Sequence, residues 1–223
     1  SEGYTYTVEK KSSGGGSSSS GGGGSTSSDK TETTENSDGS TTTTVTDSNG
    51  TVTETTEHKD GSTTVVETTK DGTVTTTKTD AQGNKTETVE KEGSTVITVE
   101  KTDGSTSKTT VSGYGAVKTE VSLSKEAAEN DLAVLPMPSV TADKEKSTTA
   151  PVVKVEVEDG ETAKVEIPVE NMTAGTVAVI VNEDGTEEVI KTSLMGEAGV
   201  VITVEGSATV KIVDNSKEFD DVA

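Results

Sequence analysis

The 223-residue sequence contains no cysteine and no tryptophan, and all 19 of its basic residues are lysine. Without cysteine, it can form neither a disulfide framework nor a thiolate metal site. Without arginine, it lacks the forked donor that usually grips phosphate or carboxylate groups. The net charge is −21, whereas nucleic acids and anionic membranes bind basic surfaces. We therefore expect neither of them as a partner.

Long apolar stretches and aromatic side chains are also scarce. No run reaches the length of a transmembrane helix and no signal peptide is recognisable, so we predict no membrane insertion. Hydrophobic residues make up 27% of the chain and aromatic residues 2%, which is well below an ordinary globular protein. With one histidine and no cysteine, zinc sites and Ser-His or Cys-His catalysis are not expected. We predict no catalytic residue, no metal ligand and no cofactor.

The N-terminal part of the sequence divides into a short strand and a linker. Residues 1–9 alternate tyrosine and valine with polar residues, as a half-buried strand does. The chain opens in the middle of this pattern, so we interpret it as a fragment or a processed product, with residues 1–9 as the last strand of an upstream domain. Residues 10–37 are rich in glycine, serine and threonine, and this composition predicts a flexible linker.

A repeat occupies the next part of the chain. Glycine recurs at positions 39, 50, 61, 72, 83, 93 and 104, with intervals of 11 residues except for one of 10, and each glycine follows Asp, Asn, Gln or Glu. Asn-Gly and Asp-Gly between β-forming residues indicate hairpins, because tight turns need positive φ there. Threonine is β-branched and suits strands. Residues 38–112 are therefore predicted to form an up-and-down meander of about seven short strands.

This meander has very little to bury. Residues 40–112 contain only ten valine or isoleucine residues, and their burial cannot offset the conformational entropy that is lost when the segment becomes ordered. Hydrogen bonds between strands and Thr–Thr pairs must contribute the rest. The repeat is therefore either a thin sheet with solvent on both sides or partly disordered, and we favour the sheet.

The turn length decides which side chains face one another. Two-residue turns would align Val89 with Val96 and Val96 with Val111, and would place Glu54 opposite Glu67 in an unfavourable like-charge pair. Three-residue turns with a glycine bulge would shift the pairing by one residue and face these valines with threonine. We predict two-residue turns in the C-terminal half of the repeat and leave the N-terminal half open.

Residues 113–214 differ from the repeat because aliphatic residues alternate along them. The pattern predicts about eight strands, an aliphatic core that includes Ile180, and a small β-sandwich-like domain. Ser124 is expected to cap a short helix over the sequence KEAAEND. Asp184 and Gly185 are expected to form a hairpin turn. The sequence LAVLPMPSVTA should be extended, since its prolines do not permit a helix.

The C-terminal sequence resembles a known family. The segment SATVKIVDNSK is followed closely by FDDVA, in which Phe219, Asp221 and Val222 match the F-x-D-V opening of an S-layer homology domain. Together with the threonine-rich repeat, this ending resembles the stalk and pre-anchor β-domain of bacterial surface proteins that carry such domains. We assign residues 215–223 to the start of an S-layer homology domain. The resemblance implies an extracellular protein of a bacterium with a Gram-positive type of cell wall. It also implies that domains after Ala223 bind the protein to wall polysaccharide.

Two features of the repeat could carry chemistry of their own. His58 lies beside a turn, but a catalytic or metal role needs convergent partners, so we interpret it as a solvated residue. The acidic turns resemble calcium ligands, but a dedicated calcium site needs six to eight oxygens. Most of these turns offer one or two carboxylates, so turn chemistry accounts for them, while weak calcium binding stays open.

The sequence thus predicts a structural role and no enzymatic activity. An acidic, threonine-rich sheet stays soluble and extends the chain, so we expect a cell-surface spacer that links an upstream displayed domain to the wall anchor. The alternative is an adhesin-type module that binds a host glycan or protein. A concave or aromatic patch on residues 113–214 would favour the alternative. The sequence does not determine the oligomeric state.

Overall fold

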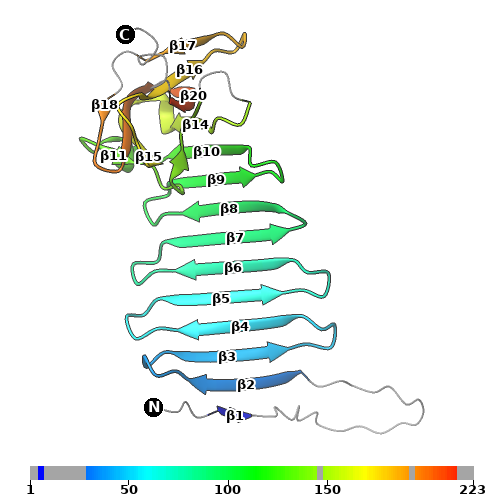
Figure 1. Ribbon diagram of the computed structural model, residues 1–223. Coiled ribbons are helices and arrows are strands. Elements are labelled where there is room, and N and C mark those ends of the chain that lie inside the picture. The colour runs from blue at the N-terminus through cyan, green and yellow to red at the C-terminus, as the bar shows by residue number, and fades with distance from the viewer. Residues whose placement is uncertain (1–4, 8–28, 145–147, 191–193, 215–223) are drawn as a thin grey trace, which may run out of the picture. The chain divides into compact units, whose positions relative to one another are not determined.

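The computed structural model of the chain describes residues 5–7, 29–144, 148–190 and 194–214 (Figure 1). Contacts between Cα atoms divide it into two compact units. Unit 1 is Ser1–Gln82 with Glu87–Glu92, and unit 2 is Gly83–Thr86 with Gly93–Ala223. The predicted fold class is confirmed: the protein is mainly β, with a meander of consecutive antiparallel strands followed by further sheets.

Unit 1 is a layer of antiparallel strands that follow one another in sequence order (Figure 1). Its strands are β1 (Thr5–Thr7), β2 (Lys30–Glu35), β3 (Thr41–Thr46), β4 (Val52–Glu57), β5 (Thr63–Thr68), β6 (Val74–Thr79) and most of β7 (Lys85–Lys91). Residues 30–35, expected within the linker, instead form strand β2, because their threonines pair with the threonines of β3. The glycine-rich residues 10–28 lie outside the described residues.

The strands of unit 1 are in a register that groups threonines in rows. Thr43 lies opposite Thr33 on one side and Thr55 on the other, and Thr55 lies opposite Val65. Since cross-strand neighbours share one face of a sheet, these β-branched side chains pack against one another along a row. Among residues 29–92, only Ser40 is buried, so both faces of this sheet meet solvent.

The predicted valine row in the C-terminal half of the repeat is wrong. Strands β8 (Ser94–Glu100) and β9 (Thr106–Val111) place Val96 opposite Thr110, and Val111 opposite Thr95. In the N-terminal half, which the sequence left open, Glu54 lies opposite Val66 instead of Glu67. The register therefore avoids the like-charge pair, and between β8 and β9 it places both Val96 and Val111 opposite threonine.

The reason for the shifted register is the form of the turn. Between β8 and β9, the Lys101 N–H donates to the Ser105 carbonyl over 2.8 Å, and the Gly104 N–H donates to the Lys101 carbonyl over 3.0 Å. Gly104 has a φ of 92°. This is a three-residue turn with a glycine bulge. The extra residue moves every following pair by one position, so Val96 meets Thr110.

One turn does have the predicted two-residue form. Strand β7 ends at Lys91 and β8 begins at Ser94, and the two residues between them both have positive φ, 48° at Glu92 and 79° at Gly93. Positive φ at both central positions defines the type I′ turn, which matches the twist of the flanking strands. The two-residue turn at this site is confirmed, and the pairing of Val89 with Val96 stays a prediction.

Unit 2 contains two sheets. The first has the strand order β8, β9, β10 (Val117–Leu123), β14 (Val152–Val157), β20 (Ser207–Asp214), β16 (Thr176–Val181) and β17 (Glu187–Val189), with β13 (Asp143–Lys144) beside β20. The second has the order β11 (Ala133–Val134), β15 (Thr162–Glu170), β19 (Gly199–Glu205) and β18 (Leu194–Met195), with β12 (Val140–Thr141) beside β15. A short helix α1 (Lys125–Ala128) and a 3-10 turn η1 (Glu158–Gly160) join these strands.

The hydrophobic core lies between these two sheets. Leu123, Val153 and Ile212 come from the first sheet, and Val165 and Ile167 come from the second; all are at most 1% exposed. Along these strands, the buried residues either alternate with exposed residues or form a short continuous apolar run. The core is aliphatic, as predicted from the composition of this segment.

Two local predictions in unit 2, a cap at Ser124 and a hairpin at Gly185, are confirmed, although the capped helix covers only Lys125–Ala128 of the predicted KEAAEND. The Ser124 side chain accepts a hydrogen bond of 3.2 Å from the Ala127 N–H and so caps α1. Strands β16 and β17 are joined by a turn in which Gly185 has a φ of 83° and donates its N–H to the Asn182 carbonyl over 2.9 Å. These signals depend only on neighbouring residues, because caps and tight turns need specific side chains or positive φ.

Candidate functional site

The turns of unit 1 repeat one hydrogen-bonded arrangement. In the turn after β5, the Thr69 N–H donates to the Thr73 carbonyl over 3.0 Å, and the Gly72 N–H donates to the Thr69 carbonyl over 3.0 Å. Gly72 has a φ of 89°, where any other residue would be strained. The same two bonds recur in the turns that begin at Asn36, Asp47 and His58. The 11-residue interval therefore encodes a strand and a turn of constant form.

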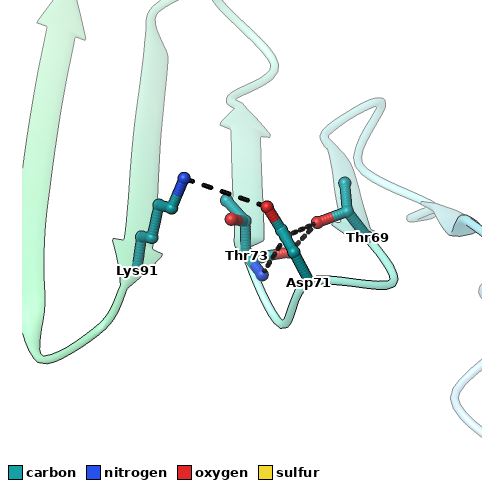
Figure 2. Close-up of polar contacts among 4 residues, drawn as sticks. All are labelled: Thr69, Asp71, Thr73 and Lys91. Carbon is teal, nitrogen blue, oxygen red and sulfur yellow. Dashed lines mark hydrogen bonds and ion pairs between the residues drawn. The ribbon is translucent and has the colours of Figure 1, made fainter.

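An aspartate side chain closes each turn. In Figure 2, the Asp71 carboxylate accepts hydrogen bonds from the Thr69 hydroxyl and from the Thr73 N–H, the second at 3.0 Å. The other Asp71 oxygen lies 3.8 Å from the Lys91 ammonium group. The Thr69 hydroxyl and the Thr73 N–H, with a smaller contribution from Lys91, lower the pKa of Asp71 from 3.8 to about 2. Asp71 thus acts on the backbone of its own turn.

The same carboxylate clamp occurs at other turns. Hydrogen bonds from Ser40 lower the pKa of Asp38, and hydrogen bonds from Ser62 lower the pKa of Asp60. In unit 2, Thr186 does the same for the pKa of Asp184. A carboxylate that accepts hydrogen bonds is favoured in its charged form. As predicted, these acidic residues accept hydrogen bonds within the turns in which they lie.

The arrangement bears on the calcium question. In each clamp, one carboxylate oxygen is already occupied by donors of the turn, such as the Ser62 N–H at 2.8 Å from Asp60. In the described ranges, no three His, Asp or Glu side chains lie close enough together to hold a metal ion. Weak calcium binding by the acidic surface, which the sequence leaves open, does not require such a cluster.

His58 takes part in the same kind of turn. Its backbone N–H donates to the Ser62 carbonyl over 2.9 Å, and its carbonyl accepts from the Gly61 N–H over 3.1 Å. The imidazole Nε2 lies 3.3 Å from the Thr64 hydroxyl oxygen. The described contacts of His58 are therefore those of a turn residue beside a threonine row.

Unit 2 contains a groove of about 680 Å³. Tyr114 stands at it with its side chain turned to solvent, since the residue is 87% exposed. Aliphatic and proline residues form about half of the remaining wall, namely Ile97, Val111, Val117, Pro138, Val140, Ala142 and Pro151. An apolar groove with an exposed aromatic ring has the composition of a ligand-binding surface.

Sequence reasoning missed one buried charged residue. Glu166 lies on β15 and is 3% exposed. Its Oε1 accepts hydrogen bonds from the Ala198 N–H at 2.6 Å and from the Gly199 N–H at 2.9 Å. The carboxylate therefore fixes the loop that leads into β19. No local signal reveals this, because Glu166 occupies a position of the alternating pattern that normally faces solvent.

The residues that carry the family resemblance are Phe219, Asp221 and Val222, and they lie outside the described residues. Within the described ranges, no helix has the length and apolar character needed to cross a membrane. Comparison with protein-family models, with curated proteins and with solved structures found no match.

Proposed function

We propose that this protein is a non-enzymatic cell-surface spacer that links a displayed domain to a cell wall through an S-layer homology anchor. The observation that supports the proposal is the construction of unit 1. Its strands are added at a constant interval, and residues 29–92 bury only Ser40. Such a sheet gains length with each strand, about 4.8 Å per step, without any need for a larger core.

The surface chemistry of the chain suits this role. The net charge is −21, so the sheet repels other acidic surfaces and stays solvated. An acidic chain without arginine should also not adhere by charge to the anionic polymers of a Gram-positive wall. Affinity for the wall is therefore assigned to S-layer homology domains, as the resemblance at Phe219 to Val222 implies.

Retention on purified wall sacculi tests the proposal. The chain alone should be retained poorly, and a fusion with S-layer homology domains after Ala223 should be retained strongly. Deletion of residues 51–72, which removes two repeats, should leave retention of the fusion unchanged and shorten the sheet by about 10 Å. Because the chain has no cysteine, dyes on Asp29→Cys and Glu90→Cys can report this shortening by energy transfer. Equal retention of the chain and the fusion would contradict the spacer assignment.

The groove at Tyr114 supports a second candidate function, an adhesin-type module that binds a glycan or a protein. An exposed aromatic ring can stack on a sugar or insert into a protein partner. Tyr114→Ala should then reduce binding to a glycan array or to host matrix proteins at least tenfold. Leu194→Ala is the matched control, since Leu194 is also exposed, at 61%, and does not line the groove. Equal losses in the two variants would contradict this candidate.

A further inference from the structure

Strands β2 to β6 pair only with the strands that precede and follow them in the sequence. Each of the four successive pairs from β2 to β6 aligns six residues with six residues. The apolar clusters of the described chain contain no residue from this part of the protein. A strand that leaves the edge of the sheet therefore exposes little apolar surface and disturbs one neighbour, as in other repeat architectures.

The turns between these strands are also self-contained. In the turn that starts at His58, the bonds to Ser62 and from Gly61 close within five residues, and Asp60 accepts the Ser62 N–H over 2.8 Å. The ion pair between Asp71 and Lys91 does connect one turn to a later strand, but it is exposed and 3.8 Å long. Exposed ion pairs couple their partners weakly. Successive repeats are thus joined mainly by the hydrogen bonds between strands.

The topology determines how tension acts on these bonds. In a meander, the chain enters at one edge of the sheet and leaves at the other. Tension on the chain therefore pulls the outer strand away along the hydrogen bonds, which run perpendicular to the strands. For β2, the pair of Lys30 with Thr46 is stressed first and the pair of Glu35 with Thr41 last. The bonds break one after another instead of resisting together.

From these observations, we infer that unit 1 is an extensible tether whose strands detach one repeat at a time under tension and pair again when the tension falls. This inference rests on the proposed spacer function and adds that the reach of the spacer increases with load. A folded repeat contributes one strand spacing of about 4.8 Å. Fully extended, its 11 residues span about 36–40 Å, so each detached repeat should lengthen the chain by about 32–35 Å.

Optical tweezers can test this on the full chain, held by tags at its two termini. The expected record is a series of reversible steps of about 32–35 Å. Release of residues 30–91 in one event of about 200 Å would overturn the inference, because the sheet would then behave as one cooperative unit. Smooth lengthening without discrete steps would also overturn it, because the repeats would then not be ordered.

A reversible crosslink identifies the steps that belong to unit 1. Thr44 of β3 lies opposite Glu54 of β4, and the chain has no other cysteine, so Thr44→Cys with Glu54→Cys can form one disulfide. The crosslink hides ten residues, about 33–36 Å of extended chain. We expect the oxidised protein to lose one step while the others keep their size, and the same protein under reductant, which is the matched control, to regain it. An unchanged number of steps after oxidation would refute the assignment of the steps to single repeats.

This experiment is independent of the cell wall. Stepwise extension together with failure in the sacculus assay would support the tether inference and contradict the proposed spacer function. Success in the sacculus assay together with opening in one event would support the proposed spacer function and contradict the tether inference.

Discussion

Truncation of Ile212 tests where the stability of this protein lies. Ile212 is on β20, is 0% exposed, and faces Ala178 of β16 across the sheet. Its N–H donates to the Pro151 carbonyl over 3.0 Å, so its backbone is fixed from both sides. Ile212→Ala removes three carbon atoms from a fully buried side chain of the main apolar cluster. Such changes cost about 2–5 kcal/mol of unfolding free energy.

Urea unfolding followed by hydrogen exchange measures this cost. With a slope of about 2 kcal/mol per molar, the midpoint of the unit 2 transition should fall by about 1–2.5 M. Thr76→Ala on β6 is the control: the residue is half-buried in the solvated sheet and should cost well under 1 kcal/mol, about the range for surface substitutions. Exchange should be slowest in β14, β15 and β20 and faster in β2 to β6.

Two outcomes would refute this reasoning. A cost below about 1 kcal/mol for Ile212→Ala would mean that the core is not closely packed. Slower exchange in residues 29–82 than in the core strands of unit 2 would mean that inter-strand hydrogen bonds stabilise the repeat more than apolar burial stabilises the sandwich.

Three further predictions concern single side chains. Glu166→Ala should cost about 1–3 kcal/mol in urea unfolding, because the Ala198 and Gly199 N–H groups lose their buried acceptor; Glu166→Gln keeps one acceptor oxygen, and an equal cost for both would contradict the clamp. The pKa of Asp71 is lowered from 3.8 to about 2, so its stabilisation of the turn is present above pH 4 and is lost as the pH falls towards 2; carboxyl chemical shifts should show this, and a midpoint near 4 would contradict it. Glu92→Asn should raise the stability of the repeat by up to about 1 kcal/mol, because Glu92 has a φ of 48° and Asn tolerates that region better; a lower urea midpoint would contradict it.

The sequence predicts the strands and turns of this protein well because both signals are local. Threonine and valine prefer extended backbone for steric reasons, and glycine supplies positive φ at the turns. Between residues 38 and 112 the structure has seven strands, β3 to β9, as the glycine spacing predicts. The cap at Ser124 and the hairpin at Gly185 are predictable for the same reason.

The register is not predictable from the same residues, because two turn types fit them equally well. Asp103-Gly104 can form a two-residue turn or the end of a three-residue turn with a bulge, and these differ by one position in every following pair. The choice of the bulged form places Val96 opposite Thr110. The burial of Ile180 is not predictable from its neighbours either. Its apolar run predicts a core residue, yet Ile180 is half-buried and packs at the margin of the main apolar cluster.

The candidate sites were predictable only in part. Asp60 and Asp71 could be placed in turns, since Asp-Gly is a turn signal. The buried role of Glu166 depends on a loop more than 30 residues later in the chain, and the Tyr114 groove depends on a segment that starts at Pro138. Contacts of such sequence separation leave no periodic pattern, so they can be read only from the folded chain.

One interval in the glycine spacing nevertheless carries information on turn type. Gly39 begins the series, and Gly50, Gly61, Gly72 and Gly104 each follow an interval of 11 residues. All five turns have the hydrogen-bond pattern of a bulged turn. Gly93 follows an interval of 10, and its turn is the two-residue form with Glu92 at positive φ. A bulged turn needs one more residue than a type I′ turn, so a shortened interval is what the change of turn type requires. The sheet of the repeat has little core to fix its register, so the number of residues in each turn must fix the register. Insertions or deletions of single residues in the repeat should therefore be less well tolerated than the substitution of any one threonine.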